Sequence, residues 1–117
     1  MADKENIKSR IAYRASRTII SNTIIYSVKM SNWYVCLAPN SPSGEGTNLF
    51  CIKEISIIPN TSASIKILVQ YWNNSLNMEF ITLTGTDYTG WGTNDNYMIM
   101  KVAEKVGLGA LRDISMN

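Results

Sequence analysis

Hydrophobic and polar residues alternate with a period of two in the most regular part of the chain, residues 65–72. One face of this segment carries Ile65, Ile67, Val69 and Tyr71, and the other carries Lys66, Leu68, Gln70 and Trp72. A period of two is that of a β-strand with one buried face and one partly exposed face. We therefore predict a strand here, with the face of Ile67 in the core.

Similar apolar runs recur between Thr18 and Gly85, separated by short polar turns such as Ser21-Asn22. They are rich in Ile, Val, Thr and aromatic residues, and read TIISNTIIYSV, NWYVCLA, LFCIKEISII, SIKILVQYW and NMEFITLTG. Pro-Asn-Thr-Ser at residues 59–62 separates two of these runs and predicts the tip of a hairpin. Short strands at such intervals are typical of an all-β fold, and we predict an antiparallel β-sandwich or jelly roll.

The segment YMIMKVAEKVG, residues 97–107, fits two structures. It fits a strand if alternate residues from Met98 to Val102 point inward. It also fits a helix that is capped by Asp95 or Asn96 and stopped by Gly107. The β-rich context leads us to predict a strand, followed by a last strand within residues 110–116.

The charges divide the chain into an N-terminal arm, residues 1–17, and a β-domain, residues 18–117. The net charge is +2 overall. The arm has five bases and two acids, which gives +3, whereas the rest has six bases and seven acids, which gives −1. Apolar residues at every fourth position predict a helix in the arm. A total of 117 residues is enough for one domain with a real core.

Two hypotheses account for the basic arm. Its side chains could neutralise phosphates of a nucleic acid, with the tyrosine stacking on a base, although so few charges would give weak binding. Alternatively, the arm contacts a neighbouring subunit, which we favour over nucleic acid. The residues concerned are Lys8, Arg10, Tyr13, Arg14 and Arg17.

Catalytic chemistry has little support in the composition. The chain has no histidine, which is the commonest general base and triad partner. Two cysteines without histidine do not make the usual zinc site, and the carboxylates are scattered. We predict that the protein is not an enzyme and has no metal or cofactor.

Cys36 and Cys51 flank the loop LAPNSPSGEGTNLF. They would form a cross-strand disulfide if this loop closed a hairpin with the two residues opposite each other. The N-terminus has no hydrophobic segment of signal-peptide type, so we favour two buried, reduced thiols. No apolar run approaches the roughly 20 residues of a membrane helix, so we expect synthesis in a cytoplasm and no membrane partner.

The stretch GTDYTGWGTNDN, residues 85–96, has the residue mix of a lectin-like loop. Two aromatic rings could stack on a sugar while acidic and amide side chains form hydrogen bonds with it. These residues are Tyr88, Trp91, Asp87, Asn94 and Asp95. The alternative, which we favour, is a hairpin connection whose Trp91 packs over the end of the sandwich. Trp72, opposite in phase to Tyr71, is a further candidate contact because exposed aromatic residues are frequent at interfaces.

The runs SNTIIYSV, LFCIKEISIIPNTSASIKILVQYW and FITLTG resemble a pattern in small β-sandwich virion proteins of tailed bacteriophages. The likeness covers Asn22 to Gly85. It implies capsid decoration, head-fibre or tail accessory roles, usually as homo-oligomers, and it implies no catalytic residue. Our first hypothesis is thus a phage structural protein, made in the host cytoplasm, that binds other virion subunits. The alternative is a carbohydrate-binding module that uses the 85–96 loop.

Overall fold

The computed structural model of the chain describes residues 16–28, 33–39, 41–43, 45–92 and 94–113. Their strands form one seven-stranded sheet in which every pairing is antiparallel. The strands are β1 (Ser16–Ile20), β2 (Thr23–Ser27), β3 (Tyr34–Leu37), β4 (Thr47–Ile58), β5 (Ser62–Gln70), β6 (Leu76–Thr84) and β7 (Leu111–Asp113). The predicted antiparallel sheet is therefore confirmed, whereas the predicted all-β class is not, because the described residues also contain two helices.

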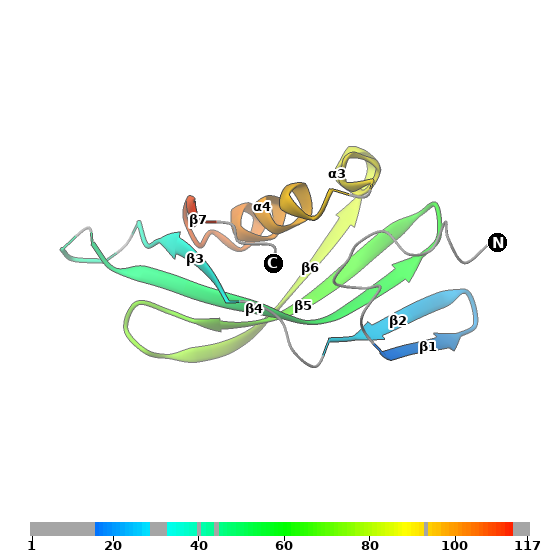
Figure 1. Cartoon of the computed structure of the whole chain (residues 1–117), viewed down its shortest axis with the longest axis horizontal. Coiled ribbons are helices and arrows are strands. Elements are labelled where there is room, and N and C mark those ends of the chain that lie inside the picture. The colour runs from blue at the N-terminus through cyan, green and yellow to red at the C-terminus, as the bar shows by residue number, and fades with distance from the viewer. Residues whose placement is uncertain (1–15, 29–32, 40, 44, 93, 114–117) are drawn as a thin grey trace.

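The long strand β4 organises the sheet (Figure 1). Its C-terminal half pairs with β2, as in Ile55 opposite Tyr26, and its N-terminal half pairs with β3, as in Phe50 opposite Tyr34. β1 extends the sheet beyond β2, and β7 extends it beyond β3. On its other side β4 pairs with β5, and β5 pairs with β6.

Local sequence explains the turns between these strands. Ile58 lies opposite Ser62, so the predicted hairpin tip has three residues between the strands, and Asn60 takes a positive φ of 62°. Asn tolerates this left-handed conformation better than most residues. The break at Ser21-Asn22 is a second hairpin turn, with two residues between Ile20 and Thr23. The predicted hairpin tip at residues 59–62 is confirmed, and the predicted break at Ser21-Asn22 is a hairpin turn.

Two helices, α3 (Gly85–Trp91) and α4 (Asp95–Val106), lie on one side of the sheet (Figure 1). The predicted strand at residues 97–107 is therefore wrong. The Asn94 side chain accepts hydrogen bonds from the N–H groups of Asn96 and Tyr97, at 3.1 and 3.4 Å. Gly107 ends the helix in the left-handed conformation with φ 82°. The buried residues of α4 follow the helical period rather than alternation; they are Asp95, Met98, Ile99, Val102 and Ala103.

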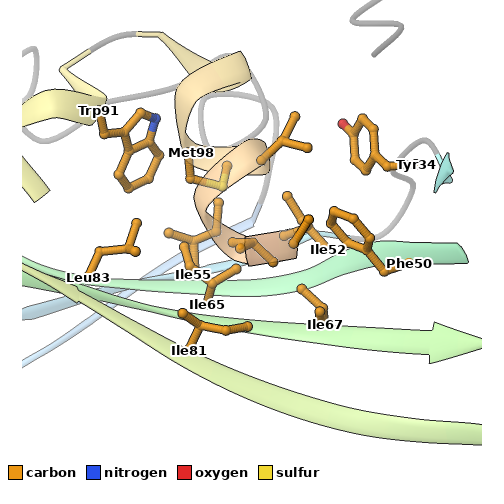
Figure 2. Close-up of a cluster of buried hydrophobic side chains, with 14 of the residues drawn as sticks. Tyr34, Phe50, Ile52, Ile55, Ile65, Ile67, Ile81, Leu83, Trp91 and Met98 are labelled. Carbon is orange, nitrogen blue, oxygen red and sulfur yellow. The ribbon is translucent and has the colours of Figure 1, made fainter. Parts of the chain in front are cut away.

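The core lies between α4 and the sheet face turned toward it (Figure 2). Ile65, Ile67 and Val69 are fully buried there, as the period of two predicts. β4 contributes to the same core, and a register shift between Ile52 and Glu54 keeps both halves of this strand in phase with it. The fold thus has two layers, a sheet and the helices that cover one of its faces.

A second sheet packed face to face on the first is not observed among the described strands, so the sandwich or jelly roll is not confirmed. The last predicted strand is confirmed in part, because β7 covers residues 111–113. The arm, with its predicted helix and four of its five candidate residues, lies in residues 1–15, outside the described part. Arg17 belongs to β1 instead.

Candidate functional site

The 85–96 segment does not form the expected hairpin connection, because it folds into α3 and the start of α4. Trp91 is fully buried, and its Nε1 donates a hydrogen bond to Asp95 Oδ1 at 3.3 Å. Tyr88 is buried too, and its hydroxyl accepts a hydrogen bond from the Asn60 N–H at 3.0 Å. Neither ring is presented to solvent for stacking on a sugar. Trp91 packs over the sheet, as the favoured alternative held, but from a helix.

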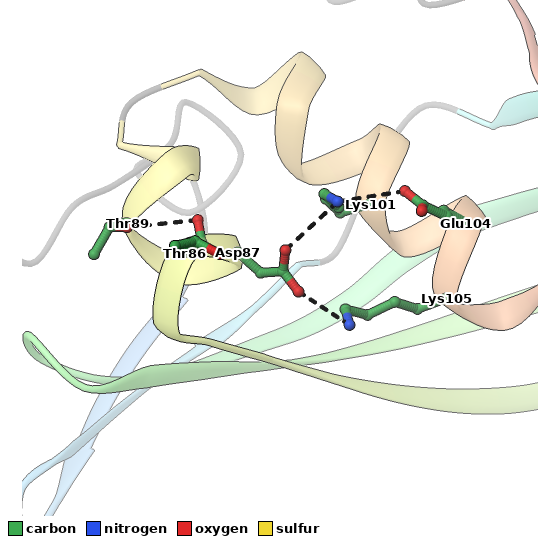
Figure 3. A network of polar contacts seen from close by, with 6 residues as sticks. All are labelled: Thr86, Asp87, Thr89, Lys101, Glu104 and Lys105. Carbon is green, nitrogen blue, oxygen red and sulfur yellow. Dashed lines mark hydrogen bonds and ion pairs between the residues drawn. The ribbon is translucent and has the colours of Figure 1, made fainter.

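The polar residues of the same segment have structural partners. Asp87 forms ion pairs with Lys101 and Lys105, at 3.5 and 3.0 Å, which join α3 to α4 (Figure 3). The hydrogen bond from Lys105 and the positive charges nearby hold the pKa of Asp87 below its ordinary value. Asn94 caps α4, and Asp95 is buried beside Trp91. The arrangement stabilises two helices and does not converge on a ligand site.

Trp72 follows β5 and is 40% exposed. Its N–H donates a hydrogen bond to Oδ1 of Asn48, at 3.0 Å. Asn48 is buried on β4, and its Nδ2 donates to the Leu108 carbonyl at 2.8 Å. Asn48 thus ties the end of β5 to the segment after α4. The sequence analysis missed this residue because its partners are 24 and 60 positions away.

The sheet face turned away from the helices carries a large group of apolar side chains. They project from β3, β4, β5 and β6 in alternation with buried residues of the core face, and pairs such as Leu68 and Met78 lie opposite each other. Five are exposed large hydrophobics, with Phe80 at 70% and Leu76 at 61%. We call this set the apolar half-face; its residues are Trp33, Val35, Leu37, Leu49, Leu68, Leu76, Met78 and Phe80.

Along β5 and β6 the other half of the same face is polar, whereas β1, β2 and β4 place Ile20, Ile25 and Ile58 on it, with Ile20 59% exposed. Ser64 of β5 lies between Ser56 of β4 and Thr82 of β6, and Ser62 lies opposite Thr84. Between the halves, Lys66 lies opposite Glu54 on one side and Phe80 on the other. Its Nζ is 5.8 Å from the centroid of the Phe80 ring. Along β5 and β6 this face is therefore divided into an apolar and a polar half with a charged boundary.

β6 shows how unusual the apolar half-face is. In its first half the apolar residues Leu76, Met78 and Phe80 point away from the core. In its second half Ile81 and Leu83 point into the core. The apolar side chains of the strand therefore change from one face of the sheet to the other between Phe80 and Ile81, which we call the phase reversal. A strand with one buried face would keep a single phase along its length.

Reactive groups are few in the described part of the chain. No cluster of three or more potential metal ligands occurs there. Cys36 and Cys51 are both buried, as predicted, and Cys36 lies opposite Asn48 rather than Cys51. Burial raises the pKa of the Cys36 thiol to about 11, so this thiol is neutral and weakly nucleophilic at neutral pH.

The helices α3 and α4, which are those that the structure describes, are too short and too polar to cross a membrane. Comparison of the chain with protein-family models, with curated proteins and with solved structures finds no match.

Proposed function

We propose that this chain is a structural subunit that acts by protein–protein assembly through the apolar half-face. The observation that carries the proposal is the exposure of five large hydrophobic side chains on one half of one sheet face. Contiguous exposed apolar surface on a folded domain marks an interaction site or an aggregation hazard. Along β5 and β6, the second half of this face carries serine and threonine instead, so the exposed apolar residues of these two strands are confined to the apolar half-face.

The energy available from this surface is adequate for association. Full burial of a Leu, Met or Phe side chain contributes about 1.5–3 kcal/mol. The exposed residues of the half-face are about half-exposed, so covering all five contributes roughly 5 kcal/mol before the cost of association. Trp72 at the β5–β6 turn is a further exposed aromatic residue.

The proposal also accounts for the sandwich that the sequence predicts. A subunit that lays its own sheet on the apolar half-face would complete a two-layered β-structure between chains. Following the resemblance to small virion proteins, we propose that the assembly is part of a tailed-phage particle, as a capsid decoration, head-fibre or tail accessory protein. Its partners are then other virion subunits and copies of itself, and the basic arm is a second contact.

The first experiment measures the mass of the full-length protein by light scattering over a range of concentrations. We expect an oligomer. Leu37→Lys places a charge in the apolar half-face and should lower the mass. Ser64→Lys places the same charge in the exposed polar half and serves as the matched control. A monomeric wild-type protein at every concentration, or equal masses for the two variants, would contradict the proposal.

The virion assignment has its own test. Mass spectrometry of purified tailed-phage particles, released from cells that carry this sequence, should detect the chain, and electron microscopy should place it. An oligomer that is absent from particles would overturn the virion assignment and leave the assembly proposal standing.

A further inference from the structure

The free edge of β6 is the second unusual feature of the molecule. β6 has nine residues and pairs with β5 along one side. Among the described strands, none pairs with its other side. The register with β5 runs from Leu76 to Thr84 without a shift, so no bulge bends this edge away.

The direction of the backbone groups follows from the turn before β6. The Tyr71 N–H donates to the Ser75 carbonyl, which makes these two residues a hydrogen-bonded pair. In an antiparallel ladder such pairs alternate with pairs that do not bond each other. The odd-numbered residues of β6 therefore bond β5. The even-numbered ones, including Met78, Phe80 and Thr82, direct their N–H and C=O groups to the free edge.

The free edge lacks the devices that usually protect such strands. β6 contains neither proline nor lysine, and its one charged residue is Glu79. The Glu79 carboxylate accepts hydrogen bonds from the Tyr71 hydroxyl at 2.7 Å and from Asn77 Nδ2 at 2.9 Å, on the helix side of the sheet. The side chains beside the outward backbone groups are Leu76, Met78 and Phe80. The edge is thus open to another strand.

A groove runs beside this edge on the helix side. It is lined by residues 79–82 of β6 and by Lys105 and Val106 of α4, and its volume is about 450 Å³. Lys105, which is ion-paired with Asp87 at 3.0 Å, lies at its border next to the uncharged second half of β6. An extended chain that pairs with β6 would have room for its side chains in this groove.

We propose that β6 pairs antiparallel with β6 of a second copy of this chain, about a two-fold axis at Phe80. This inference rests on the proposed assembly function and names one contact in it. The register centred on Phe80 uses all nine residues and keeps even-numbered residues bonded to even-numbered residues, as the backbone directions require. It places Met78 opposite Thr82 of the second copy, and Phe80 opposite its own counterpart.

Charge and shape favour a second copy as the occupant. In this register Glu79 lies opposite the uncharged Ile81 of the second copy, so no two carboxylates face each other across the new strand pair. The neighbouring register, centred on Glu79, would set two carboxylates opposite each other, which is unfavourable. Pairing between even-numbered residues also keeps both apolar half-faces on the same side of the joined sheet, where they meet at the two Phe80 side chains.

Hydrogen exchange of the wild-type protein tests the pairing without any mutation. The amides of Met78, Phe80 and Thr82 should become protected as the protein concentration rises and the oligomer forms. The amides of Glu79 and Ile81 bond β5 in either case, so they are protected at every concentration and serve as internal controls. Fast exchange of the three edge amides in an assembled protein would overturn the inference.

A matched pair of variants gives an independent test. Thr82→Pro removes an N–H that points to the free edge, whereas Thr82→Val keeps that N–H and a β-branched shape. The valine variant should keep the mass of the wild-type oligomer. The proline variant should remain folded, as measured by circular dichroism. Its mass should be half that of the wild-type oligomer, because the β6–β6 contact that joins two copies is lost. A folded proline variant of unchanged mass would overturn the inference while the assembly function stands; a monomeric wild-type protein would overturn both.

Discussion

Replacement of Ile67 by aspartate tests the assignment of the two sheet faces. Ile67 lies in the middle of β5, between Ile52 of β4 and Glu79 of β6. Its side chain is fully buried on the face turned toward α4. An aspartate there has a carboxylate neighbour across the strand and apolar groups around it. We expect Ile67→Asp to abolish or nearly abolish the cooperative fold.

Two terms give the size of this effect. Loss of the buried aliphatic side chain costs about 2–5 kcal/mol, as in Ile→Ala substitutions. Burial raises the pKa of an unpaired carboxyl group by up to 3–5 units, so at pH 7 the group must take up a proton or stay charged, which costs about 4 kcal/mol more. The sum of about 6–9 kcal/mol is comparable to the whole stability of a domain, about 5–15 kcal/mol.

Urea denaturation and thermal melting measure the effect, with Ile67→Asn as the control for shape without charge. Since the folded-state pKa of the new carboxyl is raised, its destabilisation grows as the pH rises above about 4, the ordinary pKa of aspartate. The difference between the Asp and Asn variants should therefore vanish toward that pH. Ser64→Asp, on the exposed polar half of the other face, should change the stability little. An unchanged melting temperature for Ile67→Asp would show that the faces are assigned the wrong way round.

Three further predictions concern pH, a helix cap and the arm. Burial raises the pKa of Cys36 from 9.0 to about 11 and is the main cause that raises those of Tyr34 and Tyr71 from 10.0 to about 12. Their contribution to stability is present below pH 9 and should be lost between about pH 9 and 12, as urea titrations at a series of pH values would show. Asn94→Ala should cost about 1 kcal/mol in thermal melting by removing the cap of α4, and an unchanged melting temperature would contradict that role. Deletion of residues 1–15, which precede β1, should leave the melting temperature nearly unchanged and reduce the mass in light scattering; loss of the fold would refute the assembly role of the arm.

The hairpin of β4 and β5 could be predicted because its signals are local. Alternation from Ile65 to Val69 defines the buried face, and Pro59 and Asn60 mark the turn between two runs of strand-forming residues. Each signal lies within a few residues of the structure that it determines. The antiparallel pairing followed from the same kind of evidence.

The helix α4 was missed because the apolar residues of the segment 97–107 fit both the period of two of a strand and the period of 3.6 of a helix. Met98 and Val102 suit an inward strand face as well as a helical stripe, whereas Met100, between them, is 45% exposed. The stop at Gly107 was visible in the sequence, and the cap was expected at Asp95 or Asn96 rather than at Asn94, but the β-rich context was given more weight. The helix α3 was missed for a related reason, because the glycines at positions 85, 90 and 92 make a helix of seven residues resemble a loop.

The apolar half-face could not be assembled from the sequence, because its members meet only through pairing between distant segments. Val35 reaches Leu49 through the β3–β4 pairing, and Leu68 reaches Met78 through the β5–β6 pairing. Alternation reports that a strand has an apolar face. It does not report whether that face meets the helices of the same chain or another molecule.

The phase reversal in β6 connects the sequence to the proposed function. Ile81 and Leu83 are apolar because α3, α4 and the sheet bury them. The same cause does not account for Leu76, Met78 and Phe80, which lie on the opposite face of the same strand and are exposed. Exposed apolar side chains beside unpaired backbone groups favour uncontrolled strand pairing. The proposed partner, which covers that face and that edge, would account for the presence of both features in one nine-residue strand.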